Sequence, residues 1–201
     1  ATMWGGKISI NSAMLFSCGF ILNFVFGGIT GVALAQVPFD IHVHDTYFVV
    51  AHFHYIVYGG SVFVIFSSIY HWFPKVSGKL LNEKLGILHF AITFIGFNLC
   101  FAPQHWLGLN GMPRRVAEYD PQFQLINQVS SVGALLMAVS TIPFLLNIFL
   151  SIKNGRKAGD NPWNALTPEW LTSSPPPVEN WEGEAPLVEE PYGYGKPIIS
   201  E

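Results

Sequence analysis

Charged residues are absent from four long stretches of the chain, and this absence is its most informative pattern. The stretches lie at residues 8–39, 46–74, 85–113 and 121–152. A helix needs about 20 mostly apolar residues to cross the hydrocarbon core of a bilayer, and each stretch is longer than that. Because backbone amides in lipid need internal partners, each stretch should be helical. The sequence therefore predicts an all-α, polytopic membrane protein with spans near Ser12–Ala35, Tyr47–Phe73, Leu85–Leu109 and Leu125–Ile152.

The overall composition supports this class and excludes several others. Only 11% of the 201 residues are charged and 50% are hydrophobic, whereas soluble domains carry about 25% charged residues. A secreted disulfide scaffold, a soluble nucleotide-binding domain and a basic nucleic-acid binder are therefore excluded, and no nucleic-acid partner is expected.

The basic residues predict how the spans are oriented. One side of the membrane should carry most of them: Lys7, Lys75, Lys79, Lys84, Lys153, Arg156 and Lys157. Only Arg114 and Arg115 fall on the other side. Because basic loops stay inside, the first side should be cytoplasmic or matrix. The outer face then brings the loop around residues 40–45 close to Arg114 and Arg115.

The chain changes character after Lys157. Residues 158–201 hold eight of the 14 prolines and eight acidic residues. Such a segment cannot build its own core. We therefore expect a membrane portion at 1–157 and an extended, Pro-rich acidic tail at 158–201, lying on partner surfaces with Trp163, Trp170 and Trp181 as anchors. Within the first span, Gly27-x-x-x-Gly31 favours close helix packing.

Two histidines flank one phenylalanine at the start of the second span, as His52-Phe53-His54. Ionisable residues at membrane depth are costly and usually functional. On a helix the two imidazoles point about 200° apart, so they cannot share one metal. Either they bind two different metals or hemes on opposite sides of the helix, with Phe53 between them, or they form hydrogen bonds to neighbouring helices.

A second polar group precedes this helix. His44 and Asp45 could hold a hard cation at the membrane surface, with Asp40 adding a carboxyl group. Alternatively, Asp45 or Thr46 is simply the N-cap of the following helix. Arg114 and Arg115 could pair bidentately with carboxylates, either heme propionates or the nearby Glu118 and Asp120.

These residues lie in two motifs that resemble one family. His44-Asp-Thr-Tyr-Phe-Val-Val-Ala-His-Phe-His-Tyr55 resembles the most distinctive stretch of subunit I of the heme–copper terminal oxidases. Pro103-Gln-His-Trp-Leu-Gly-Leu-Asn-Gly-Met-Pro-Arg-Arg115 resembles the heme-propionate loop of the cytochrome c oxidase branch. The resemblance runs from about Ala1 to Ile152. It implies the last four helices of a twelve-helix subunit.

The resemblance also implies roles for these residues. His52 would be the axial ligand of high-spin heme a3, His54 an axial ligand of low-spin heme a, and Phe53 would lie on the electron path between them. His44 and Asp45 would bind magnesium or manganese. Asp40, Arg114 and Arg115 would lie at the heme propionates. His42 has no counterpart, and no role is assigned to it.

The resemblance further implies the function of a proton-pumping cytochrome c oxidase, which reduces oxygen to water, in a bacterial plasma membrane or the mitochondrial inner membrane. It requires the N-terminal remainder of subunit I, which carries the copper B ligands. It also requires subunit II, with copper A and a carboxylate for the magnesium site, and subunit III is a further expected partner. The chain is either a natural fragment of a split subunit or part of a longer one.

Two alternatives remain open at this point. A four-helix b-type cytochrome would need a second heme-facing histidine within the chain, and His89 and His105 are the candidates in the third span. His89 is otherwise expected to be a polar packing contact. The second alternative is a membrane subunit without heme, in which the histidines pack or line a path.

Overall fold

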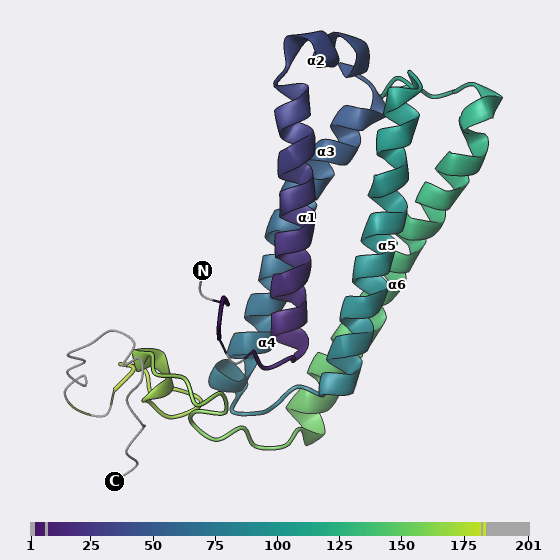
Figure 1. The fold of residues 1–201 in the computed structure, drawn as a ribbon. Helices are drawn as coiled ribbons and strands as arrows, with labels where there is room; N and C mark the ends of the chain where they lie inside the picture. The colour runs from purple at the N-terminus through teal and green to yellow at the C-terminus, as the bar shows by residue number, and fades with distance from the viewer. Residues whose placement is uncertain (1–2, 7, 182, 184–201) are drawn as a thin grey trace.

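The computed structural model describes residues 3–6, 8–181 and 183, and four long helical segments dominate it (Figure 1). The first is α1 (Ser12–Leu34), and the second joins α3 (Tyr47–Val57), the π-helical η1 (Tyr58–Val62) and α4 (Phe63–Ser77). The third is α5 (Glu83–Leu109) and the fourth is α6 (Gln124–Asn154). All four are long and apolar enough to cross a membrane, which confirms the predicted class and its four spans.

Three short helices complete the described secondary structure, which contains no β-strand. The helix α2 (Val37–Val43) connects α1 to α3, and the 3₁₀ turns η2 (Pro121–Phe123) and η3 (Pro168–Trp170) lie before α6 and in the tail. The order of elements makes the chain cross the bundle four times. The α2 connection and the α5–α6 loop therefore lie at one end, and the α4–α5 loop lies at the other (Figure 1).

Polar caps set the ends of several helices. The Asn11 side chain accepts a hydrogen bond from Met14 N, and the Asn82 side chain accepts from Lys84 N and Leu85 N. These caps satisfy backbone amides that the first helical turn leaves free. Because Asn82 caps α5, that helix begins two residues before the predicted span.

The second span contains a local departure from α-helical geometry. Residues Tyr58–Val62 adopt a π-helical turn, which the sequence pattern did not predict. Gly59 lies within it, close to α1: a Cβ atom there would lie 2.9 Å from Asn23 Cβ. The wider turn and the missing side chain therefore occur at a position where this span lies close to α1.

Helices α5 and α6 pack along most of their length, with polar contacts at several levels. Gln104 Nε2 donates to Ser130 Oγ at 2.9 Å, and Thr93 Oγ1 donates to Ser140 Oγ at 2.9 Å. Near the other end, Asn147 Oδ1 accepts from Asn82 N. Inter-helix hydrogen bonds of this kind stabilise membrane bundles, in which apolar contact alone gives little preference over lipid.

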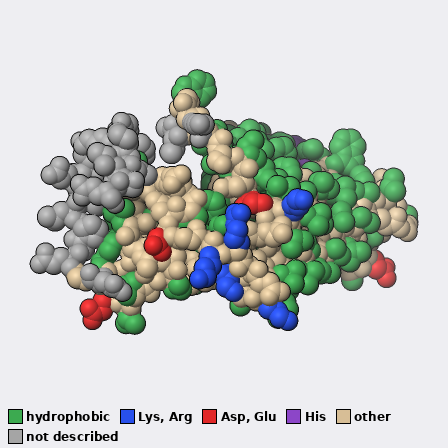
Figure 2. Space-filling view, turned by 90° about the horizontal axis from the view of Figure 1, so that it is seen from below, with side chains coloured by type: hydrophobic (Ala, Val, Ile, Leu, Met, Phe, Trp, Pro, Cys, Tyr) green, Lys and Arg blue, Asp and Glu red, His purple; other side chains and the backbone are tan. Residues whose placement is uncertain are grey.

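The two ends of the bundle differ in charge, as predicted. Figure 2 shows lysine and arginine side chains gathered at the end opposite α2, where α4 and α6 finish and α5 begins. Residues 79 and 157 form an isolated β-bridge there. Lys7, one of the basic residues used to predict orientation, lies outside the described residues.

The described part of the tail packs against the end of α4 in its own chain. Trp170 is 2% exposed, and Trp163 Nε1 donates to the carbonyl oxygen of His71 at 3.0 Å. Lys75 is 6% exposed, and its amine donates to the backbone oxygens of Asp160 and Thr172 at 3.0 and 2.7 Å. Two of the expected tryptophan anchors therefore hold the tail to the end of α4.

Candidate functional site

His52 lies on α3 and faces α1. Its Nδ1 atom is 3.0 Å from the carbonyl oxygen of Gly27 and 3.1 Å from the hydroxyl oxygen of Thr30. A carbonyl oxygen can only accept, so Nδ1 carries the proton. The Nε2 atom, which has no partner among the described residues, then carries the free lone pair.

His54 lies on the same helix and faces α5. Its ring stacks on Phe101, with ring centroids 4.1 Å apart and an interplanar angle of 14°. Its Nδ1 atom donates to the carbonyl oxygen of Val50, one turn earlier, at 2.7 Å. His54 therefore also has its proton on Nδ1 and its Nε2 lone pair free.

Phe53 lies between the two histidines in the sequence, and its side chain is 39% exposed. Its ring centroid lies 4.4 Å from that of His54. The two imidazoles contact different neighbouring helices, in agreement with the 200° separation expected from the spacing. The His52–His54 segment therefore offers two independent ligands rather than one shared metal site.

Both imidazoles fit axial ligation of an iron porphyrin. Metal-binding histidines generally donate the second ring N–H to a carbonyl or carboxylate, which fixes the tautomer and ring orientation. His52 and His54 each do so through Nδ1. Neither partner of His52 on α1 was predicted from the sequence; the available signal was Thr30, one of a few polar residues in this span, which also holds Ser17 and Asn23.

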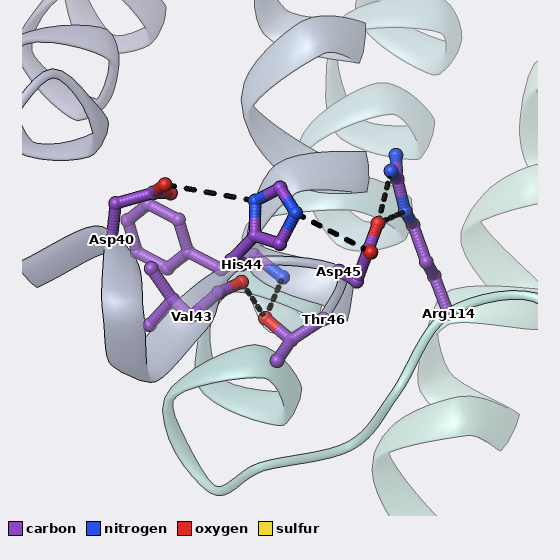
Figure 3. Close-up of polar contacts among 7 residues, drawn as sticks. Asp40, Val43, His44, Asp45, Thr46 and Arg114 are labelled. Carbon is purple, nitrogen blue, oxygen red and sulfur yellow. Dashed lines mark hydrogen bonds and ion pairs between the residues drawn. The ribbon is translucent and has the colours of Figure 1, made fainter.

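A chain of charged groups lies at the α2 end of the bundle (Figure 3). His44 Nδ1 is 3.6 Å from Asp40 Oδ2, and His44 Nε2 is 3.4 Å from Asp45 Oδ2. Arg114 then pairs with Asp45 Oδ1, through Nε at 2.8 Å and also through Nη2. The predicted proximity of Arg114 to the acidic cluster is therefore present.

The backbone around Asp45 explains this arrangement. Thr46, not Asp45, is the N-cap of α3: its hydroxyl accepts from Phe48 N and donates to the carbonyl oxygen of Val43. Asp45 adopts a left-handed conformation with φ of 55°, which Asp tolerates better than most residues. Its side chain is thus free to meet Arg114, whose N–H also donates to the Asp45 carbonyl oxygen at 2.9 Å.

The ion pair also affects the titration of Asp45. The hydrogen bond from Arg114 is the main cause that holds the pKa of Asp45 below its ordinary value of 3.8, and the nearby positive charges of Arg114, His44 and Arg115 act in the same direction. The carboxylate therefore stays charged at neutral pH and is available to a cation.

His44 and Asp45 could contribute two ligands to a magnesium or manganese ion. Adjacent ligands of octahedral Mg²⁺, with bonds of about 2.1 Å, lie roughly 3 Å apart. The 3.4 Å between His44 Nε2 and Asp45 Oδ2 is close to this. Across residues 3–6, 8–181 and 183, no group of three or more His, Cys, Asp or Glu residues is arranged to hold a metal. A complete site would need ligands from outside these residues.

The other candidate residues of the outer loops lie outside the Asp45–Arg114 pair. Arg115 is exposed, with φ of 62°, and Asp120 caps η2 by accepting from Gln122 N, so neither joins the Asp45–Arg114 pair. His42 is also exposed. Arg114 therefore takes Asp45 as its carboxylate partner within the chain, rather than Glu118 or Asp120.

The two histidines that a b-type cytochrome would require are enclosed by aromatic rings. His89 is fully buried, its Nδ1 atom lies 3.1 Å from the Tyr70 hydroxyl, and rings of Phe16, Phe66 and Phe144 surround it at 4.5–5.0 Å. The prediction that His89 is a packing contact is confirmed. Rings of Phe26, Phe48 and Tyr55 lie 5.0–5.5 Å from His105.

The fold and the site thus describe a helical membrane protein with two imidazoles on different sides of one helix, each held through Nδ1 by a backbone carbonyl. The family model described as "Cytochrome C and Quinol oxidase polypeptide I" matches residues 1–136. Cytochrome c oxidase subunit 1 of Thermostichus vulcanus is 60% identical over 195 residues, covering 97% of this chain and 35% of the relative. The chain belongs to this oxidase polypeptide I family.

A second relative supports this assignment, and one solved structure shares the fold. A putative cytochrome c oxidase subunit 1-beta of Streptomyces avermitilis is 49% identical over 184 residues, covering 90% of this chain and 33% of the relative. A cryo-EM structure of a heme-copper terminal oxidase dimer has a similar fold, with a TM-score of 0.64 and 23% identity over 73% of this chain and 27% of that one. The chain spans about a third of the length of these curated relatives.

Proposed function

We propose that this chain is the part of a proton-pumping cytochrome c oxidase subunit I that ligates both hemes. His52 is assigned to high-spin heme a3 and His54 to low-spin heme a. The observation that carries the proposal is the shared geometry of the two imidazoles: each Nδ1–H is held by a backbone carbonyl, which leaves Nε2 free. Two relatives that are each 60% identical to this chain are named cytochrome c oxidase subunit 1.

The residues of this chain have three tasks in that function. His52 and His54 present Nε2 lone pairs at a separation set by one helix, and Phe53 fills the space between them. Bound hemes, with copper B held outside this chain, supply electron transfer and oxygen reduction. The carbonyls of Gly27 and Val50 hold the Nδ1–H groups, so the ring orientation is fixed and Nε2 is the nitrogen presented to each iron.

The charged end of the bundle is proposed to serve the propionates and a cation. His44 and Asp45 would bind Mg²⁺ or Mn²⁺ together with a carboxylate of subunit II. Asp40 and the exposed Arg115 would lie at the propionates, with Arg114 shared between a propionate and Asp45. Replacing both arginines by Gln should shift heme potentials without removing the hemes.

The assembly and location are part of the same proposal. Residues 1–157 would form the last four of twelve membrane helices, and the tail from residue 158 would lie on the cytoplasmic or matrix side, where the basic residues gather. The N-terminal remainder of subunit I, subunit II and subunit III would complete the complex, with cytochrome c as electron donor.

Spectroscopy of the assembled oxidase tests the heme assignments. His52→Ala should remove the high-spin heme and its carbon monoxide difference spectrum. His54→Ala should remove the low-spin heme signal while carbon monoxide binding is partly kept. His42→Ala, at an exposed histidine without an assigned role, is the matched control and should leave both signals intact.

Two results would contradict the proposal. Both heme spectra could persist in the His52→Ala or His54→Ala variant, which would show that the ligands lie elsewhere. A pyridine hemochrome spectrum with heme b alone would instead favour the b-type cytochrome.

A further inference from the structure

Helix α1 forms a seat for the His52 imidazole, made by three residues within two turns. The carbonyl oxygen of Gly27 and the hydroxyl of Thr30 lie 3.0 and 3.1 Å from His52 Nδ1. Gly31 lies against the ring carbon between the two nitrogens, where a Cβ atom would be 2.7 Å from His52 Cε1. The Gly27-x-x-x-Gly31 pattern, expected to serve helix packing, therefore lies against a ligand imidazole.

The direction of the hydrogen bonds in this seat follows from donor counting. Thr30 has one hydroxyl proton and donates it to the Gly27 carbonyl oxygen at 2.9 Å. Its oxygen can then only accept from His52. The Nδ1–H of His52 is thus shared between two acceptors, the Gly27 carbonyl and the Thr30 hydroxyl. Thr30 is 91% buried, so water does not readily replace its hydroxyl.

We propose that Thr30 is a positioning residue for His52, which orients the imidazole and strengthens the bond from Nε2 to the heme iron. This inference rests on the proposed function, in which His52 is an axial ligand. Acceptors on the remote N–H raise the basicity of a ligating imidazole. Greater basicity favours the oxidised iron and a stronger iron–histidine bond, so Thr30 helps to set the reduction potential of that heme.

The first test compares Thr30→Val with Thr30→Ser in the assembled oxidase. Val has nearly the shape of Thr but no hydroxyl, whereas Ser keeps the hydroxyl. Resonance Raman spectra of the reduced, ligand-free enzyme should show a lower iron–histidine stretching frequency in Thr30→Val, and redox titration should show a higher potential for the high-spin heme. Thr30→Ser should match the unmodified oxidase in both measurements.

A second hydroxyl-free variant keeps this test decisive if Thr30→Val assembles poorly. Thr30→Ala removes the same hydroxyl with a smaller side chain and should give the same two shifts. The inference is overturned if the hydroxyl-free variants retain the unmodified frequency and potential, or if Thr30→Ser shifts as much as they do.

Two glycines of the same helix test the seat itself. Gly31→Ala should displace the imidazole and change the iron–histidine frequency, because a methyl group there collides with the ring. Gly28→Ala is the matched control, since a Cβ atom at Gly28 has no neighbour within 4 Å. Equal iron–histidine frequencies in Gly31→Ala and Gly28→Ala would contradict the contact proposed between Gly31 and the His52 ring.

Failure of the role proposed for Thr30 can be distinguished from failure of the proposed function. If His52→Ala leaves both hemes in place, the ligand assignment fails. If His52→Ala removes the high-spin heme while the Thr30 variants are indistinguishable, only the role of Thr30 fails.

Discussion

The imidazole of His54 is stacked on the ring of Phe101, with centroids 4.1 Å apart. Phe101 is buried on α5, so this contact fixes one face of the proposed heme a ligand against a neighbouring helix. No aromatic ring of the described residues stacks on His52, which is held through Nδ1 by α1 instead. The two proposed ligands are therefore held by different helices, and each can be perturbed separately.

Removing the Phe101 ring should affect the low-spin heme alone. Phe101→Leu keeps an apolar side chain but loses the flat surface, so the His54 imidazole should rotate more freely. We expect a broadened or shifted low-spin heme signal in electron paramagnetic resonance, with an unchanged carbon monoxide spectrum. Phe90→Leu, on the same helix, is the control, and an equal effect there would argue against a specific role of the stack.

Breaking the Arg114–Asp45 pair should loosen the loop between α5 and α6. The loop is held to the start of α3 by two backbone hydrogen bonds, Arg114 N to the Asp45 oxygen and Tyr47 N to the Met112 oxygen. In Arg114→Gln we expect a few-fold faster hydrogen exchange at both amides, because exposed ion pairs contribute modestly. Arg115→Gln, at a neighbouring exposed arginine, should leave both rates unchanged.

The same pair gives a pH dependence with a definite sign. Asp45 has its pKa lowered by Arg114, so its contribution is present above the ordinary value of 3.8 and is lost as the pH falls through the lowered pKa. The amides of Arg114 and Tyr47 should therefore stay protected from hydrogen exchange above pH 3.8, once the exchange rates are corrected for their intrinsic pH dependence. Loss of protection near neutral pH would show that another group controls the loop.

Lys75 should determine whether the described tail stays attached to α4. Its amine donates to the backbone oxygens of Asp160, Thr172 and Ser173 and lies 5.1 Å from the centre of the Trp170 ring. Hydrogen bonds to a charged group contribute about 1.5–3 kcal/mol each, so Lys75→Met should speed proteolysis of residues 160–173 by roughly tenfold or more. Lys79→Met, which removes a single exposed hydrogen bond to Ile152, is the control.

Asn147 should stabilise the contact between α5 and α6. Its side chain accepts from Asn82 N at 2.8 Å and donates to the Asn82 carbonyl oxygen at 2.9 Å, and it is fully buried. Inter-helix hydrogen bonds in membranes contribute about 0.6–2 kcal/mol, so Asn147→Leu should lower the thermal unfolding midpoint of the purified complex. Asn154→Leu, at an exposed position of α6, should not.

Sequence reasoning predicted much of the fold because the bilayer imposes it. Four charge-free stretches became four membrane-length helices, and the basic residues gathered at one end. The contact of the described tail with α4 was not predicted: Lys75 of α4 donates to the Thr172 carbonyl oxygen, and Trp163 of the tail donates to the His71 carbonyl oxygen. The π-helical turn at Tyr58–Val62, where Gly59 lies close to Asn23 of α1, was also not predicted, because hydrophobic periodicity does not register one turn of a different pitch.

The sequence by itself determined the class, the spans and the opposite directions of His52 and His54, since helix periodicity and the cost of burying charge are local properties of the chain. Only the tertiary structure decided which groups hold these residues. Thr30 meets His52 across 22 residues, Arg114 meets Asp45 across 69, and Lys75 meets Thr172 across 97. Such partners depend on how the helices pack, because a hydrogen bond needs its two atoms within about 3 Å. Residues so far apart in the sequence come that close only in the folded chain.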